Sequence, residues 1–379
     1  MIRAATLAVL VLALAACSSA RRENIQPPAE LVDFTSTVSV QRIWSRDVGD
    51  LGGRPGFRMA PSHVDGRLYV ANTGGDLLVL DASSGGEINR FRSDRPYATT
   101  PAVAEGAIAI GTIDGHLVVL DAQSGGERFA VRLTAEVIAT PEIAGGRVFV
   151  RSHDGRVSAY ALADGSRVWV QETTVPPLSL RGNAPLRHDR GFLLVAQDDG
   201  RVVALRADDG TPVWQQQVGL AEGRTDLERL ADVDGEIAIA DGVVFAVGFE
   251  GQVMAIDIAG GAPIWARELS SATGVALGED LFVSSADGKV QALDRFTGDP
   301  RWVQEALLHR WLTTPAVVAG HIAVADVEGY VHWLSPADGS FAARERVARK
   351  PVRAAPLAVG NTVFVTATDG TIAAFRVGG

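Results

Sequence analysis

The residues best suited to bind a partner lie in two long segments that interrupt an otherwise regular sequence. The segments read VPPLSLRGNAPL at 175–186 and GRTDLERLADVDG at 223–235. Their candidate contact residues are Leu178, Leu180, Arg181, Asp232 and Asp234. Leucines two positions apart point the same way in an extended chain, arginine can grip a carboxylate through two hydrogen bonds, and aspartates can accept from amides or pair with basic side chains. Apolar and arginine anchors within a charged rim are typical of a protein-binding surface.

The same residues also allow a purely structural interpretation. The two leucines could pack their segment onto the rest of the fold, and Arg181 could pair internally with Asp232 or Asp234. Nothing would then bind at this place. The pattern alone leaves both interpretations open.

Known motifs of catalysis and metal binding are missing from the sequence. The phosphate-binding motif G-x-x-x-x-G-K-[ST] does not occur, and neither do G-x-S-x-G and H-E-x-x-H. The seven histidines show no i,i+2 or i,i+4 pairing. The string from Asp232 to Glu236 resembles part of a calcium loop, but it lacks the third acid and the distal glutamate. We therefore expect no catalytic residue, no metal site and no cofactor.

The composition limits the class of protein and of partner. With 47% hydrophobic and 21% charged residues, the chain has the composition of a globular protein. Its net charge of -10 argues against nucleic acid as the partner, because neutralising phosphates needs a concentrated basic surface. The single cysteine excludes a disulfide framework and a cysteine-rich metal site.

That cysteine ends a processing segment. After a short positive start, thirteen largely apolar residues run to Ala16. This is too short to cross a bilayer, which takes about 20 helical residues, so we interpret residues 1–16 as a secretory signal. The string LAAC resembles the bacterial lipobox, which implies lipidation of Cys17, and Ser18 implies sorting to the outer membrane. A plain secretory signal is the alternative. Residues 17–37 are polar and are expected to form a lipidated tether.

The remaining residues, 38–379, repeat one unit eight times. A typical copy, DDGRVVALRADDGTPVW, has an acidic residue and a glycine, then alternating apolar positions, a second glycine turn and a tryptophan. The glycines that close the first turn are Gly75, Gly115, Gly155, Gly200, Gly251, Gly288, Gly329 and Gly370. Their mean spacing of about 42 residues suits four short strands per unit.

The second copy shows how these strands are assigned. Strands are expected from Pro101, at 107–112, at 116–121 and at 127–133, with tight Gly turns between them. No helical period occurs anywhere in the repeats. The sequence therefore predicts an all-β fold, an eight-bladed β-propeller of four-stranded antiparallel blades in one domain.

The last blade needs a strand from the other end of the chain. The eighth copy stops nine residues after Gly370, before its fourth strand. The segment from Val38 to Val48 contains an unassigned strand with Trp44. We expect this strand to complete blade eight, which closes the ring and removes exposed sheet edges. The repeat tryptophans are expected to pack between blades, although Asn89, Phe129 and Ala343 stand at that place in three copies.

The period breaks only in the links between blades. From the outer-strand aromatic position to the next first strand the distances are thirteen residues for Trp302 to Pro315, sixteen for Trp169 to Pro185 and twenty-three for Trp214 to Ile237. Two successive links are thus enlarged, and they are the two candidate segments. Equivalent links emerge on the same face, so these two must be neighbours. Loops on a rigid scaffold are where binding sites gather.

Two families resemble this sequence. The repeats resemble those of quinone-dependent alcohol dehydrogenases, but those enzymes are larger and commonly cover the cofactor with a vicinal cysteine pair, which Cys17 alone cannot provide. Both long segments, the eight repeats and the lipobox closely resemble the BamB family, lipoprotein subunits of the outer-membrane β-barrel assembly machine. This second resemblance covers essentially the whole chain.

The BamB resemblance implies a non-enzymatic protein of the outer membrane's periplasmic face that binds a periplasmic POTRA domain of BamA, the membrane-embedded insertase. The contact residues of that family map onto Leu178, Leu180, Arg181, Asp232 and Asp234. Nascent outer membrane proteins are a further candidate partner. The rivals are a lipid-anchored dehydrogenase that binds pyrroloquinoline quinone and calcium, and a propeller that binds sugar or peptide in its central channel.

Overall fold

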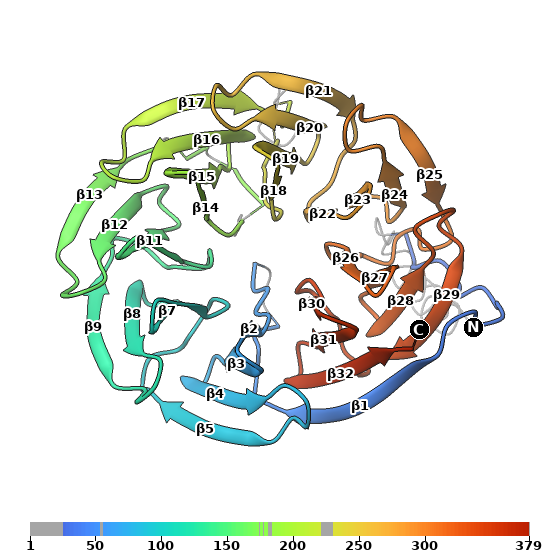
Figure 1. Cartoon of the computed structure of the whole chain (residues 1–379), viewed down its shortest axis with the longest axis horizontal. Coiled ribbons are helices and arrows are strands. Elements are labelled where there is room, and N and C mark those ends of the chain that lie inside the picture. The colour runs from blue at the N-terminus through green and yellow to red at the C-terminus, as the bar shows by residue number, and fades with distance from the viewer. Residues whose placement is uncertain are drawn as a thin grey trace, which may run out of the picture.

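Eight four-stranded antiparallel sheets stand around a central axis in the computed structural model (Figure 1). The structure describes residues 26–53, 56–173, 175–176, 178–180, 184–220 and 230–378. All regular elements in these ranges are strands. Within them there is also no helix of the length and apolarity that a membrane crossing requires. The expected eight-bladed β-propeller is confirmed.

Each blade is a meander whose strands follow one another from the axis outward (Figure 1). The first four blades consist of β2 (Ser62–Val64), β3 (Arg67–Ala71), β4 (Asp76–Asp81) and β5 (Glu87–Arg92); β6 (Ala102–Ala104), β7 (Ala107–Gly111), β8 (His116–Asp121) and β9 (Glu127–Arg132); β10 (Glu142–Ala144), β11 (Arg147–Arg151), β12 (Val157–Ala161) and β13 (Arg167–Gln171); and β14 (Arg187–Asp189), β15 (Phe192–Ala196), β16 (Arg201–Arg206) and β17 (Pro212–Gln217). The last four consist of β18 (Ala238–Ala240), β19 (Val243–Val247), β20 (Gln252–Asp257) and β21 (Pro263–Glu268); β22 (Val275–Leu277), β23 (Leu281–Ser284), β24 (Val290–Leu293) and β25 (Pro300–Gln304); β26 (Ala316–Val318), β27 (His321–Ala325), β28 (Tyr330–Leu334) and β29 (Phe341–Arg346); and β30 (Leu357–Val359), β31 (Thr362–Thr366), β32 (Thr371–Val377) and β1 (Val40–Asp47).

The two middle strands of a blade are its most buried part. In the second blade, all five residues of β7 are buried, as are the four central residues of β8. Both faces of these strands are covered, because each blade packs between two neighbours. This is why the middle strands are nearly continuous apolar runs, whereas the outer strands alternate with polar residues.

The ring is closed by the N-terminal strand, as the sequence predicts. Strand β1 pairs antiparallel with β32 and becomes the outer strand of blade eight. Trp44 lies opposite Ala374, in the register that Trp169 has opposite Ala159 in blade three. The first and last segments of the chain therefore form one sheet.

Tryptophans of the outer strands fasten each blade to the next. The indole Nε1 of Trp214 donates to the carbonyl oxygen of Ile258 in the following blade, at 2.8 Å. The indole of Trp214 lies so close to Gly261 that a Cβ added at Gly261 would be 2.5 Å from Trp214 Cγ. The backbone at Gly261 also has a φ of +73°, which favours glycine. The same contact with a turn glycine and a carbonyl is made by Trp44, Trp169, Trp265 and Trp302. The expected packing between blades is confirmed.

The three copies without this tryptophan reach similar packing in other ways. In blade two, Phe129 lies against Gly165. In blade one Phe91, two residues beyond Asn89, packs on Gly125. In blade seven the outer strand has Ala343 at this position, and the tryptophan lies on the third strand instead, where Trp333 is fully buried opposite Ala343.

Part of the segment expected as a tether is held against the ring. Ala29 N donates to Leu308 O at 2.9 Å, and Arg310 Nη1 donates to Ala29 O at 2.7 Å. Further along, Phe34 stacks on Phe341 with ring centroids 5.3 Å apart. Residues 26–37 thus lie along blade seven.

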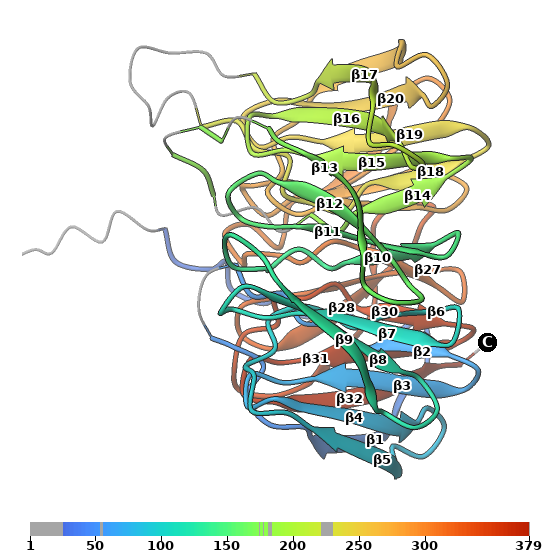
Figure 2. The same ribbon diagram turned by 90° about the vertical axis from the view of Figure 1, so that its left-hand side faces the viewer.

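The links between blades all lie on one face of the disc. In a four-stranded meander, the turn between the second and third strands lies at the same end of the blade as the link that leaves the fourth strand. Hydrogen bonds join these two places: Ser93 N donates to Gly75 O in blade one, and Val218 N donates to Gly200 O in blade four. Leu308, which holds Ala29, belongs to one of these links. The described N-terminal segment therefore emerges on the face that carries the enlarged links (Figure 2).

Ring closure can be tested by Trp44→Ala. The substitution removes the ring that packs on Gly85 and the hydrogen bond to Ala82 O. We expect a loss of about 3 kcal/mol in the free energy of unfolding, the usual range for a large aromatic residue. Trp311→Ala is the control, because Trp311 is 64% exposed. Chemical denaturation should show a clear shift for the first variant and almost none for the second; equal stabilities would contradict the closure model.

Candidate functional site

The two enlarged links touch each other. Residues 172–186 connect β13 to β14, and residues 218–237 connect β17 to β18. The backbone N–H of Leu180 in the first link donates to Oδ2 of Asp232 in the second. The links are thus neighbours on one face, as their order in the ring requires.

Asp232 is held inside the second link. Its side chain is fully buried, with 0% exposure. Its carbonyl oxygen accepts from Phe249 N at 2.8 Å, and the next residue, Val233, donates to Gln197 O at 3.2 Å. These bonds attach the end of the link to blades four and five. The buried carboxylate of Asp232 therefore holds the backbone of Leu180 in place through this hydrogen bond.

Asp234 lies two residues further along and faces the axis of the ring. It is 3% exposed, and its carbonyl oxygen accepts from Arg58 Nη1 at 3.3 Å. Neither Oδ1 of Asp232 nor Oδ1 of Asp234 has a hydrogen-bond partner among the described residues. The structure thus places two incompletely bonded carboxylates below the surface of the link.

Burial and mutual repulsion disfavour ionisation of these two acids. Burial, and then the charge of Asp234, raise the pKa of Asp232 to about 7, while the Leu180 N–H acts in the opposite direction. Burial raises the pKa of Asp234 to about 6, although the Arg58 guanidinium opposes this shift. Burial thus moves the pKa of both acids toward neutral pH.

A buried ion pair borders the same region. Arg151 pairs with Asp198, and their exposures are 5% and 3%. Asp198 adds to the negative charge felt by Asp232 and Asp234, and Arg151 offsets part of it. Within the described ranges, no group of three or more His, Cys, Asp or Glu side chains is arranged to hold a metal ion.

The first link presents apolar surface outward. Leu178 is 42% exposed, and Leu180 is half-buried. The other exposed large hydrophobic residue on a described inter-blade link is Trp311, which belongs to the link before β26. Arg181 and Cys17 lie outside the described residues, so the structure does not place them.

The sequence interpretation missed a third enlarged link. Residues 48–61 connect β1 to β2 and reach into the middle of the ring (Figure 1). Their described part contains the buried side chains of Leu51, Phe57 and Met59. The distance from Trp44 to Pro61 is seventeen residues, longer than that of the first candidate link. Counting it like the other links would have revealed this segment.

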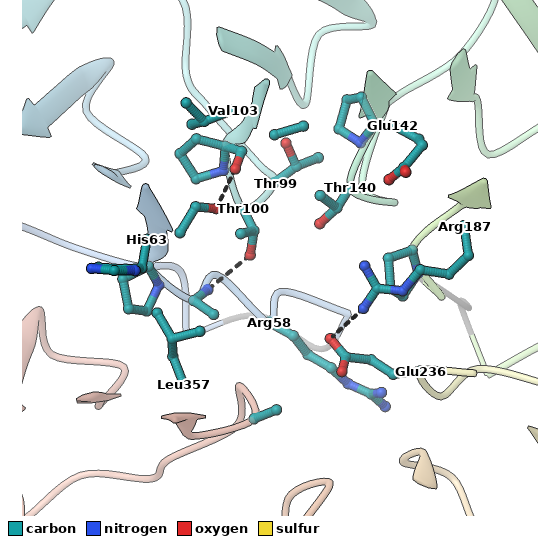
Figure 3. Close-up of a pocket in the computed structure, with 18 of the residues that line it drawn as sticks. Arg58, His63, Thr99, Thr100, Val103, Thr140, Glu142, Arg187, Glu236 and Leu357 are labelled. Carbon is teal, nitrogen blue, oxygen red and sulfur yellow. Dashed lines mark hydrogen bonds and ion pairs between the residues drawn. The ribbon is translucent and has the colours of Figure 1, made fainter. Parts of the chain in front are cut away.

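Beside this third link the central channel forms a cavity of about 450 Å³, lined by both polar and apolar residues. The first strands of several blades line it, and Arg58 extends across one side toward Glu236 (Figure 3). Arg187 Nη2 lies 3.7 Å from Glu236 Oε1 within the same wall. Its charges are mixed, so the cavity favours neither an anion nor a cation.

Comparison with known proteins gives the family. The family model described as "Outer membrane protein assembly factor BamB" matches residues 35–116, 90–304 and 287–378. The chain belongs to the BamB family. A BamB protein from Pseudomonas aeruginosa is 39% identical over 375 residues, which are 98% of this chain and 98% of that protein.

Solved structures of two kinds are similar to this chain, one from the same family and one that shares only the fold. The crystal structure of BamB from Moraxella catarrhalis has a TM-score of 0.81 and 27% identity, and the match covers 89% of this chain and 100% of that one. The quinohemoprotein alcohol dehydrogenase from Comamonas testosteroni has a TM-score of 0.71 at 14% identity, with 89% of this chain and 76% of that chain covered. The dehydrogenase likeness shows the shared propeller alone.

The buried acids predict a pH-dependent stability. Between about pH 4 and pH 7, folded Asp232 keeps a proton that the unfolded chain has lost, so its contribution makes stability fall as pH rises across this window. Asp232→Asn keeps an acceptor for Leu180 N–H and removes the titration. We expect the variant to gain stability relative to the wild type as pH rises from 4.5 to 7.5 in urea unfolding.

Asp164→Asn provides a control of the opposite sign. Hydrogen bonds from Ser166 lower the pKa of Asp164, which lies in an exposed turn. That variant should lose stability relative to the wild type as pH rises through the acid range. Parallel pH profiles for wild type and Asp232→Asn would show that burial does not control this acid.

Proposed function

We propose that this protein is a non-enzymatic scaffold of the outer-membrane assembly machinery, and that its two touching links dock a periplasmic POTRA domain of BamA. The observation that carries the proposal is the hydrogen bond between Leu180 and Asp232, which joins the two links into one surface. The relatives named as outer membrane protein assembly factors support the same role.

The surface suits a protein partner because part of it is already ordered. Leu178 stands 42% exposed on a link whose backbone is tied to a fully buried acid two residues away. Holding an apolar anchor in place before binding lowers the conformational cost of association. In this proposal Leu178, Leu180 and Arg181 contact the partner, with Arg181 gripping a carboxylate. Asp232 and Asp234 support the contact from below.

The proposal extends to membrane attachment. Cys17 carries lipid in the outer membrane, and the protein faces the periplasm. Ala29 is fixed to the link before β26, on the face that also bears the docking links. An anchor that leaves from this side keeps the docking surface toward the membrane that holds the insertase. Nascent outer membrane proteins are a second partner in the same proposal.

The central channel supports a scaffold over its rivals. Arg58 and its neighbours in residues 48–61 occupy the axis and bond to opposite sides of the ring. This link therefore takes up part of the channel, beside the cavity of about 450 Å³ in which a peptide- or sugar-binding propeller would hold its ligand. Titrating the purified protein with pyrroloquinoline quinone and calcium, and following the absorption spectrum, tests the dehydrogenase rival directly.

The docking surface is tested by Leu178→Asp. A charge at the centre of an apolar contact should weaken binding to the purified BamA periplasmic domains by about thirtyfold or more, the effect of a hot-spot residue. Ile264→Asp is the matched control, because Ile264 is 52% exposed on the outer strand β21. Arg181→Ala should weaken binding as well. Surface plasmon resonance that gives wild-type affinity for Leu178→Asp would reject the site.

The lipid anchor is tested separately by Cys17→Ser. Without the thiol no acyl chain can be attached, and the remaining chain offers no membrane-spanning helix among its described residues. We expect the variant to move from the membrane fraction to the soluble periplasmic fraction in cells that lack other assembly components. A variant that still sediments with membranes under these conditions would contradict lipid attachment at this residue.

A further inference from the structure

The most informative unassigned residue is Arg58, which spans the central channel. It belongs to the link between β1 and β2, next to blade one. Its guanidinium donates from Nη1 to Asp234 O at 3.3 Å and from Nη2 to Ala272 O at 2.8 Å. Both carbonyls lie in links beside blade five, on the far side of an eight-bladed ring. One side chain thus bridges opposite sides of the disc.

The near end of this bridge is fixed independently. Ala60 N donates to Thr100 Oγ1 at 2.9 Å in blade two, and Thr366 Oγ1 donates to Met59 O at 3.0 Å from blade eight. The side chains of Phe57 and Met59 on either side of Arg58 are buried. Arg58 therefore projects from a backbone that is bonded on the sides of blades two and eight, so it can position what it touches.

The far end leads directly to the docking links. Arg58 binds the carbonyl of Asp234, and Asp232, two residues before it, binds the N–H of Leu180. The positive charge of Arg58 also faces the buried carboxylate of Asp234. A continuous series of contacts runs from the ring-closing strand β1, through the channel, to the leucines proposed to meet the partner.

We propose that Arg58 is a positioning residue for the docking surface, which fixes the second link and, through Asp232, the first. The proposal rests on the proposed function for its effect on the partner, but not for its effect on the links. Arginine suits this role because its planar, forked guanidinium can donate to two carbonyls at once, whereas the single ammonium of lysine cannot reproduce that fork.

The experiment compares three variants of the full chain. Arg58→Met removes the fork and the charge, Arg58→Lys keeps the charge alone, and Thr73→Val removes a hydrogen bond to Asp50 O in the same central link without touching Arg58 or Asp234. Hydrogen exchange followed by mass spectrometry reports on peptides that cover 175–186 and 230–236. Binding to the purified BamA periplasmic domains is measured in parallel.

We expect exchange in both peptides to rise about tenfold or more in Arg58→Met, the effect of losing a hydrogen bond from a charged donor to a buried acceptor. Arg58→Lys should lie between this variant and the wild type. Thr73→Val should leave both peptides at wild-type rates. Binding should weaken about tenfold in Arg58→Met, in step with the exchange.

The outcomes separate the two proposals. Unchanged exchange at 175–186 and 230–236 in Arg58→Met would overturn the positioning role, whatever the partner does. Equal increases in Arg58→Met and Thr73→Val would overturn it as well, because a general loosening of the central link would then explain both. If exchange rises only in the Arg58 variants while even the wild type fails to bind BamA, the positioning role stands and the docking proposal fails.

Discussion

The structure depends on one constraint, which is that every blade must bury both of its faces against neighbours. A flat stack of such sheets would leave two apolar faces in water, and only a closed ring removes them. Closure is made by Trp44 and its strand, which supply the outer edge of blade eight and then pack on Gly85 of blade one. The same contact of an indole with a turn glycine recurs around the ring, so the closing junction is chemically like the others.

Closure by an N-terminal strand has a geometric consequence. The chain must travel from the outer edge of blade eight to the innermost strand of blade one, and residues 48–61 make that journey. Their length lets them enter the channel, where Phe57 and Met59 are buried and Arg58 reaches the opposite links. The link that follows the closing strand therefore also enters the centre of the ring, where Arg58 binds the carbonyl of Asp234 in the second enlarged link.

The sequence predicted the repeat, the blade and the closing strand because these follow from period and turn chemistry. The expected strands of the second copy agree with β6 to β9 within one or two residues. Sequence could not predict that Asp232 and Asp234 are buried, because an acidic pair next to a glycine is usually exposed. Nor could it predict that Phe91 replaces Asn89 over Gly125, since that depends on how two blades approach. Arg58 was missed because its partners are backbone carbonyls, which leave no mark in a sequence.

The buried acids show how the propeller holds its long links in place through contacts to their backbone, which do not depend on the links' outward side chains. A carboxylate in a low-dielectric site needs donors, and Asp232 finds one in the backbone N–H of Leu180 rather than in a side chain. Arg58 in turn offsets the charge of Asp234 and binds its carbonyl. Because both contacts use the backbone of the links, they leave outward side chains such as Leu178 exposed. In the proposed docking, buried polar contacts set the position of the surface, and exposed residues such as Leu178 would supply its specificity.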